Sequence, residues 1–452
     1  MVSDISARDL ARHWSHVVQQ RGFAAVIWAM PAVNYELMRY AARSLGSRDN
    51  QIVYWSTLLD WKNQTLTPNP DAIYLMPFIN TSGGPVVLEI PPAEGGSITG
   101  TAMDAWQVPL EDVGPAGVDE GRGGKYVYLP PGYGDRLPAD CIALPSETFG
   151  GYALLRSNLA GGTEQDLATA LDYARRIMVY PLSAIADPPP TTYHDAAGAL
   201  FDSTIPYHSG FFDSLNRFVQ DEPWLSRDKA MIDVLSTLGI AKGTTFTPDV
   251  DTREILDSAA QQAKAWTDAL YEAFFAQPYF PGTQWALPAS TQLVQSTATH
   301  YADPDSYPLD ARAAAYAWAF SSVKHLGAGQ FYLMSTRDNT GHVLDGSHTY
   351  RLTVPPHVPV RLYWSATAYD RDTHALIREQ PWSSRSSHTT GLQTNTDGSV
   401  TLAFGPAEPA AGSGNWIPTA PGRPFEILMR FFGPEKAFVD KTWHLPDIEL
   451  TE

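Results

Sequence analysis

The sequence predicts an α+β fold with two mostly antiparallel, sandwich-like β domains, a helical N-terminus and a helical bridging insertion. Two stretches, 51–157 and 329–452, contain short β-rich runs separated by Gly- and Pro-rich turns, which is typical of sandwiches and barrels. The segment 209–276 between them is mostly helical in pattern. A chain of 452 residues is too long for one ordinary domain, and each part is long enough to bury its own core.

The N-terminal segment is expected to form two helices. Leu10, Trp14 and Val17 fall at helical spacing within 3–21. A second helix is expected over 32–45, after Pro31, and Gly46 should end it because glycine and proline interrupt helices.

The first β-rich stretch is divided by glycine-rich turns. The expected strands are 71–78, 85–90, 97–106, 125–129, 141–144 and 152–156. The glycine-rich run 121–124 leads into a strand and not into a helix, so a hairpin loop is favoured over a phosphate-binding loop. A helix is expected over 163–178, where Thr163 and Asp166 resemble a capping box.

Three consecutive prolines at 188–190 indicate a stiff connection and the first domain boundary. We therefore divide the chain into 1–190, a bridge over 191–310 and a C-terminal β domain over 311–452. The aromatic-rich loop 277–310 could cap a pocket or pack between domains. In the last part, a helix is expected over 311–326, a turn at 337–341, and a hairpin joining 392–394 to 399–404.

The composition excludes several classes of protein. Lys plus Arg number 31 and Asp plus Glu 49, a net charge of −18 that disfavours nucleic-acid partners. The single cysteine, Cys141, excludes an intrachain disulfide and a cysteine-rich metal site. No secretory segment or membrane-spanning apolar run is recognisable, so no membrane partner is expected and the expected location is cytoplasmic.

The C-terminal part contains a set of motifs in a fixed order. They are DGSHTYRLTVP at 345–355, YWSATAYD at 363–370, NWIP at 415–418, FEILMRFFGP at 425–434 and WHLP at 443–446. This ordered set resembles the domain of unknown function 1214. His348 departs from the family pattern, in which Asn is usual at that position.

The first part resembles the domain of unknown function 1254. The motifs are PNPDAIY at 68–74, PVVL at 85–88, MDAW at 103–106 and YPL at 180–182, with LGIAKG at 238–243 in the bridge. Pro70 stands where the family more often has a second Asn. The resemblance implies a two-domain, mostly β architecture with helical insertions, and it implies no particular reaction.

The best polar cluster of the first domain lies in PNPDAIY. Asn69 can donate and accept, Asp71 can act as a base, and Tyr74 can donate a hydrogen bond. The alternative is a turn that caps a strand, with Asp71 bonded to nearby backbone.

A second candidate joins Asp104 to Trp106, which lie two residues apart and so share one strand face. A carboxylate beside a large ring can have a raised pKa, which suits a general acid. Alternatively, Asp104 forms a salt bridge, for which Arg156 is the candidate partner, and Trp106 belongs to the core.

The C-terminal domain offers four candidate binding residues. Tyr369 ends a strand and could face a cleft or form a turn. Asn415 and Trp416 follow a flexible stretch and could bind ligand or anchor their loop. Arg430 lies among apolar residues, so we expect it to point inward and to hold a structural carboxylate or a substrate anion.

Common catalytic motifs are absent. The sequence has no P-loop, no dinucleotide fingerprint, no Gly-x-Ser-x-Gly, no His-x-His and no His-Glu-x-x-His. We therefore expect no organic cofactor and assign no metal ligand, although a bound metal ion stays open.

The first functional hypothesis is an enzyme for a small organic substrate, with its pocket between the β domains. Asp71, Asp104, Tyr74 and Arg156 would supply acid/base and anchoring groups for a hydrolase, or for a lyase or isomerase. Substrate contacts would come from Asn69, Trp106, Tyr369, Asn415, Trp416 and Arg430. The alternative is a carbohydrate or small-molecule binding protein without turnover, suggested by 13 Trp and 21 Tyr. The sequence leaves open whether the protein forms a homo-oligomer.

Overall fold

The N-terminal helix is continuous where two helices were predicted. The computed structural model describes residues 7–288, 290–318, 323–325, 329–410 and 412–451. In it α1 (Ala7–Ser44) passes through Pro31 without a break. Proline has no N–H to donate to the preceding turn, but neighbouring segments bind the carbonyls around it. Gln107 Nε2 donates to the Pro31 carbonyl at 2.8 Å, and Arg312 donates to the carbonyl of Trp28. Gly46, with φ of 87°, ends the helix region as predicted.

The N-terminal β domain is a sandwich of two sheets. A six-stranded sheet has the order β11-β1-β3-β9-β5-β6, and a four-stranded sheet has the order β10-β4-β7-β8. The strands are β1 (Gln51–Tyr54), β3 (Ile73–Asn80), β4 (Val86–Ile90), β5 (Ile98–Asp104), β6 (Pro109–Val113), β7 (Gly124–Leu129), β8 (Cys141–Pro145), β9 (Gly150–Ser157), β10 (Met178–Pro181) and β11 (Tyr193–Asp195). Leu75, Leu88, Tyr126 and Leu155 pack in the core between the sheets.

All six predicted strands are present, with shifts of a few residues at their ends. The strands β1, β6, β10 and β11, of three to five residues each, were not predicted, since so few residues carry little period-2 pattern. The β11 strand follows the three prolines and pairs in parallel with β1, so the six-stranded sheet continues past residue 190.

The helix after β9 begins with the predicted capping box. In α2 (Glu164–Ala174), the Thr163 hydroxyl accepts from the Asp166 amide, and the Asp166 carboxylate accepts from the Thr163 amide. This helix packs Tyr173 and Ala174 into the sandwich core. It ends earlier than predicted, because 178–181 forms the strand β10.

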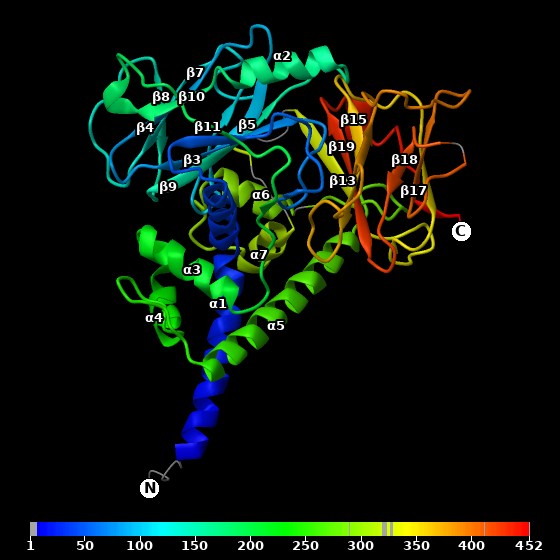
Figure 1. The fold of residues 1–452 in the computed structure, drawn as a ribbon. Coiled ribbons are helices and arrows are strands. Elements are labelled where there is room, and N and C mark those ends of the chain that lie inside the picture. The colour runs from blue at the N-terminus through cyan, green and yellow to red at the C-terminus, as the bar shows by residue number, and fades with distance from the viewer. Residues whose placement is uncertain (1–6, 289, 319–322, 326–328, 411, 452) are drawn as a thin grey trace.

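A helical layer covers the second face of the six-stranded sheet. It contains α1 with α3 (Gly210–Asp221), α4 (Lys229–Thr237), α5 (Val250–Phe275), α6 (Thr291–Ala298) and α7 (Leu309–Ala317). Figure 1 shows α1 and α5 extending away from the two β domains, with α3 and α4 beside α1. A single core joins this layer to both β domains, since it includes Tyr74 of β3 and Tyr369 and Leu428 of the C-terminal domain.

The C-terminal β domain is a second sandwich. One sheet has the order β13-β19-β15-β16 and the other β18-β17-β14-β20. The strands are β13 (Gln330–Ser335), β14 (Tyr350–Val354), β15 (Trp364–Asp370), β16 (Ser384–Ser386), β17 (Val400–Gly405), β18 (Trp416–Pro418), β19 (Phe425–Phe432) and β20 (Glu449–Leu450); two further short strands, β2 (Asn63–Gln64) and β12 (Phe201–Asp202), pair beside the helices. Leu352, Phe404, Ile427 and Met429 lie between the two sheets.

One expectation for this half differs from the structure, and of the two alternatives left open for the aromatic loop, packing is found for two rings. The segment 392–394 is not a strand, so the predicted hairpin is wrong; β17 pairs with β14 and β18 instead. The side chain of Asn415 bonds to both backbone groups of Gln393, which removes them from strand pairing. In the aromatic loop, Phe280 and Trp285 are fully buried in the C-terminal core, so these two rings pack and do not cap a pocket.

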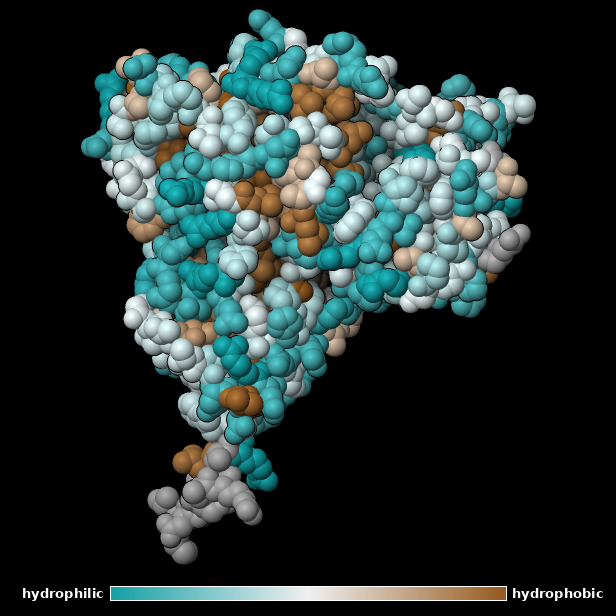
Figure 2. Space-filling model, in the orientation of Figure 1, coloured by the Kyte–Doolittle hydropathy of each residue, from teal (hydrophilic) through white to brown (hydrophobic). Residues whose placement is uncertain are grey.

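Hydrophilic side chains cover most of the face shown in Figure 2, with apolar side chains gathered in its upper central part. In the described part of the chain, no helix combines the length and the apolar character that crossing a bilayer requires.

Candidate functional site

Asn69 organises the candidate site. It lies in the turn before β3 and is 2% exposed. Its backbone N–H donates to the Tyr74 hydroxyl at 2.9 Å, and its Nδ2 donates to the Tyr363 hydroxyl at 3.3 Å. Its Oδ1 accepts from the Asp71 amide at 3.1 Å, which is the turn geometry that the sequence allowed. We call Asn69, Asp71, Tyr74, Arg156 and Tyr363 the Asn69 cluster.

Tyr74 and Arg156 come from paired positions on β3 and β9. Arg156 Nε donates to the Tyr74 hydroxyl at 2.8 Å, and the guanidinium lies 5.1 Å from the centre of the Tyr74 ring. The Tyr74 oxygen thus accepts two N–H bonds, which leaves its own proton free to donate elsewhere. Among the described residues, Arg156 donates no other hydrogen bond, so its two terminal Nη groups are free.

Arg156 has an unusual electrostatic environment. Within the described residues it forms no ion pair with a carboxylate, and its neighbours are the hydroxyls of Tyr74, Tyr332 and Tyr363. A guanidinium held in such a place without a counter-ion is costly, because burial removes its hydration. An anionic ligand would supply the missing charge and bind the free fork of the guanidinium.

Asp71 provides a carboxyl group with one uncommitted oxygen. Its Oδ1 accepts from the Ser384 hydroxyl at 3.1 Å, while Oδ2 is buried without a hydrogen-bond partner. Burial raises the pKa of Asp71 above its ordinary value, and Ser384, Arg430 and the hydroxyl of Ser365 offset part of the rise. A carboxyl with a raised pKa and a free oxygen is suited to move a proton.

Tyr363 brings the C-terminal domain into the cluster. It immediately precedes β15, and its ring is stacked between Phe432 at 4.1 Å and His388 at 4.8 Å. Burial, together with the nearby Asp71 carboxylate, raises the pKa of Tyr363, so the hydroxyl stays protonated at neutral pH. The cluster therefore holds one carboxyl, two phenols and one guanidinium from both β domains.

Arg430 and Tyr369 form a clamp beside the cluster. Arg430 Nη2 donates to the carbonyls of Thr67 and Pro68 at 2.9 and 3.3 Å and to the Tyr369 hydroxyl at 2.6 Å, while Nη1 donates to Thr367. Tyr369 donates to the Pro68 carbonyl at 2.6 Å. Arg430 points inward as predicted, but among the described residues it holds backbone carbonyls and hydroxyls and no carboxylate. These bonds fix the turn that carries Asn69.

Asp104 and Trp106 lie outside the cluster. The Asp104 carboxylate accepts from the amides of Trp106 and Val108, and it is 3% exposed. Among the described residues it forms no ion pair with Arg156, so the predicted pair is wrong. Burial raises the pKa of Asp104 to about 6. Trp106 is buried against Trp28, with the ring centres 4.9 Å apart.

Asn415 and Trp416 lie on the outer sheet of the C-terminal domain. The Asn415 amide bonds to the backbone of Gln393 and Thr401. The Trp416 indole donates to the Gly405 carbonyl at 2.9 Å and lies edge-on to Trp382. Both residues anchor their loop in this structure and make no contact with the Asn69 cluster among the described residues.

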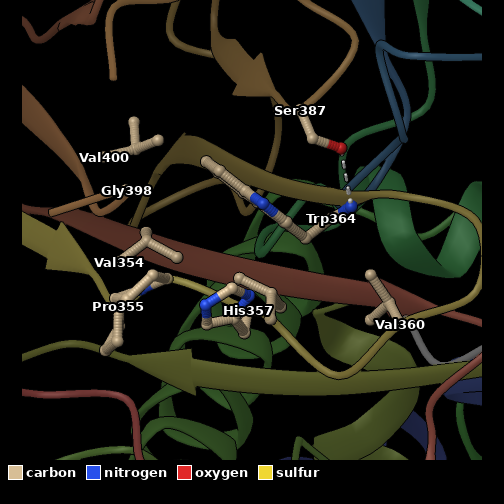
Figure 3. A pocket seen from close by; sticks show the side chains of 10 residues that line it. Val354, Pro355, His357, Val360, Trp364, Ser387, Gly398 and Val400 are labelled. Carbon is tan, nitrogen blue, oxygen red and sulfur yellow. Dashed lines mark hydrogen bonds between the residues drawn. The ribbon is translucent and has the colours of Figure 1, made fainter. Parts of the chain in front are cut away.

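One surface pocket lies in the C-terminal domain and shares no lining residue with the cluster. It has a volume of about 250 Å³, and its lining includes Trp364, His357 and Ser387, with valines and prolines around them. Figure 3 shows the Trp364 amide bonded to the Ser387 hydroxyl at its edge. It contains none of the predicted site residues. Within the described part of the chain, no three His, Cys, Asp or Glu residues gather where they could hold a metal ion.

Sequence reasoning missed Tyr363, His388 and Ser384. Tyr363 is the first residue of the YWSATAYD motif, so its place in that motif could have marked it as a candidate. Ser384 and His388 lie in a short strand and the turn after it, in a polar stretch with no pattern that marks them. Only the pairing of β16 with β15 brings Ser384 to Asp71.

The comparisons place this architecture in a known class. Two family models match, "Protein of unknown function (DUF1254)" over residues 50–181 and "Protein of unknown function (DUF1214)" over residues 329–436. The chain belongs to the family of two-domain proteins that pairs DUF1254 with DUF1214, in that order.

One solved structure supports the fold alone. The crystal structure of the VPA0106 protein from Vibrio parahaemolyticus is 19% identical, with a TM-score of 0.59, and the match covers 96% of this chain and 100% of that one. An uncharacterized protein from Burkholderia cenocepacia is 12% identical with a TM-score of 0.44, over 98% and 96% of the two chains. No curated protein matches.

Proposed function

We propose that the protein is an enzyme that acts on a small organic anion by acid/base chemistry at the Asn69 cluster. The observation that carries this proposal is the convergence of Asp71, Tyr74 and Arg156 with Tyr363 from the other domain. A proton acceptor, two proton donors and an unpaired guanidinium meet there. The fold by itself suggests no reaction.

Each group has a definable role. The free Nη groups of Arg156 bind a carboxylate of the substrate, which places the reacting carbon near Asp71. The Oδ2 atom of Asp71 accepts a proton from the substrate or from an attacking water. The free proton of Tyr74 donates to the oxygen on which negative charge develops. Such a step serves a hydrolase, and equally a lyase or isomerase. The set keeps Asp71, Tyr74 and Arg156 of the sequence-based hypothesis and takes Tyr363 in place of Asp104.

The proposal needs no organic cofactor and no macromolecular partner. A small-molecule substrate and a cytoplasmic location remain parts of it. The alternative, a binding protein without turnover, would use the same cluster to hold an anion. It gains no support from Trp106, whose ring is buried.

The test uses the purified protein and a panel of small carboxylates, including esters, lactones and hydroxy acids, with products detected by NMR. For a converted compound, Asp71→Asn should lower kcat by about 100-fold or more, as expected when a general base is lost. Tyr74→Phe should lower kcat while Arg156→Gln mainly raises KM. Asp187→Asn is the matched control, because Asp187 is exposed and its side chain forms no bond within the described residues.

Wild-type kcat in both Asp71→Asn and Tyr74→Phe would contradict the proposal. Calorimetric binding of a carboxylate that Arg156→Gln abolishes, with no product from any compound, would favour the binding protein.

A further inference from the structure

A second pocket opens where α5 meets the C-terminal sheet. It has a volume of about 330 Å³ and lies between α5, the turn after β15 and the residue before β19. It shares no lining residue with the Asn69 cluster. Its polar lining includes His374, Arg371 and Lys264, and Val343, Ala269 and Pro424 supply apolar surface. The volume is in the range of sites that bind small organic molecules.

At the pocket wall, a buried carboxylate orients a histidine. His374 Nδ1 lies 2.8 Å from Glu426 Oε1, and Glu426 is fully buried. The Tyr271 hydroxyl donates to the other oxygen, Oε2, at 2.5 Å. A carboxylate that accepts from Nδ1–H fixes the tautomer, so Nε2 carries the lone pair. Among the described residues, Nε2 forms no hydrogen bond, and His374 lines the pocket.

The backbone of His374 is held in a conformation that few residues adopt. Its φ is 55°, in the left-handed region, and such conformations persist where the surroundings impose them. Its N–H donates to the Asp370 carbonyl at 2.7 Å, and its carbonyl accepts from Thr67 at 2.6 Å. The imidazole is thus positioned by both its side chain and its backbone.

The charges around the pocket are already paired. Lys264 bonds to Asp268 at 2.8 Å, and Glu272 pairs with Arg371 and Arg337. No unpaired charge of either sign is therefore left among these residues to attract an ion, which favours an uncharged ligand. One polar atom remains open, because Arg371 Nη1 is buried without a hydrogen-bond partner.

We propose that this pocket hydrolyses small, uncharged carboxylic esters, with His374 as general base and Glu426 as its positioning residue. Nε2 takes a proton from water as the water oxygen bonds to the ester carbonyl carbon. Arg371 stabilises the resulting oxyanion. The intermediate collapses as the carbon–oxygen bond to the alcohol breaks, and the alcohol leaves with the proton from Nε2–H. The site is independent of the Asn69 cluster, which favours an anion.

The test measures hydrolysis of p-nitrophenyl acetate and p-nitrophenyl butyrate by the full chain. His374→Asn is the most selective variant, because Asn tolerates positive φ and its amide can still donate to Glu426. It removes only the base, so kcat/KM should fall by about 100-fold or more. Val343→Trp should lower the rate by filling the pocket without touching the dyad. His348→Gln, at an exposed histidine, should retain the wild-type rate.

The separate effects on kcat and KM test the role of Glu426. Glu426→Gln keeps a side-chain oxygen but removes the carboxylate that holds the His374 imidazole in one tautomer. The kcat for p-nitrophenyl acetate should fall while KM stays at the wild-type value, because Glu426 does not line the pocket. A structural role alone would change KM together with kcat.

Three outcomes would overturn the proposal: no ester hydrolysis by the wild-type protein, wild-type rates in both His374→Asn and Val343→Trp, or loss of hydrolysis in Asp71→Asn with full activity in His374→Asn. The last would assign ester hydrolysis to the Asn69 cluster. Loss of α-helical circular dichroism would identify a variant that fails to fold, and Val343→Trp then decides.

Discussion

At the scale of single residues, hydrogen-bond capacity separates the two carboxyl groups that the sequence singled out. Asp104 satisfies one oxygen with two backbone amides of its own turn. Asp71 leaves Oδ2 without a partner and lies near the Tyr363 phenol. Both carboxyls are desolvated and both have raised pKa values, so a raised pKa alone does not distinguish a catalytic carboxyl from a structural one.

Asp104→Asn should stabilise the protein at alkaline pH. The pKa of Asp104 rises from its ordinary value of 3.8 to about 6, which corresponds to about 3 kcal/mol. Because the folded pKa is above the unfolded one, the folded state is favoured below pH 4 and loses this contribution as pH rises through 6. Asn keeps an oxygen for the two amides. Urea unfolding should show that the variant gains about 3 kcal/mol over wild type between pH 4 and pH 8.

Asp187→Asn provides the comparison, because the Asp187 side chain is exposed. A pH-independent difference between Asp104→Asn and wild type would show that Asp104 is not desolvated as described.

The sequence predicted the members of the site that share one motif, and it could not predict which motifs meet. Asn69, Asp71 and Tyr74 stand together in PNPDAIY, so local hydrogen-bond chemistry marked them. Arg156 joins them only through the pairing of β9 with β3. The link between His374 and Glu426 spans 52 residues and depends on two turns and a strand register, for which a single sequence carries no local signal.

At the scale of secondary structure elements, the hydrophobic periodicity of the sequence predicted the longer strands and missed several short ones. β3 and β9 have eight residues each and were predicted, whereas β1 and β10, with four each, were not. Pro31 was expected to divide the N-terminal helix, since a proline removes one helical hydrogen bond. Donors from Gln107 and Arg312, far along the chain, bind the carbonyls near it. These tertiary hydrogen bonds accompany a helix that continues through Pro31, although proline usually interrupts a helix.

The capping box of α2 gives a prediction at this scale. Thr163→Ala removes the hydroxyl that accepts from the Asp166 amide, so the first turn of α2 loses about 1 kcal/mol. Hydrogen exchange of the amides at 164–167 should become faster. Thr163→Ser keeps the hydroxyl and should exchange like wild type. Equal exchange in Thr163→Ala and wild type would mean that the cap contributes nothing to the helix.

At the scale of the whole molecule, the two sandwiches are joined by a shared hydrophobic core and by the hydrogen bonds of Arg430. The core includes α1, the outer face of the six-stranded sheet, and Tyr369 and Leu428 of the C-terminal domain. The clamp is Arg430, whose donors reach two carbonyls of the Asn69 turn. The position of Tyr363 against Asn69 therefore depends on contacts between the domains.

Arg430→Met should weaken the connection between the sandwiches. The side chain loses its hydrogen bonds to Thr67, Pro68, Thr367 and Tyr369, at a cost of about 3 kcal/mol, since bonds to a charged donor contribute most. Differential scanning calorimetry should show a lower Tm and a broadened or split transition. Arg351→Met, which removes an exposed ion pair with Glu449, should change stability by less than about 1 kcal/mol. A single transition at the wild-type Tm would contradict the clamp.

The shared helical core also limits which part of this chain could be moved into another protein. The matched family segments, 50–181 and 329–436, exclude α1 and α3–α7, yet those helices supply the surface on which both sandwiches rest. A recombination event that moved either segment alone would expose Tyr74 or Tyr369 and Leu428 to water. Each matched segment therefore depends on the helices to bury the side chains that it contributes to the shared core.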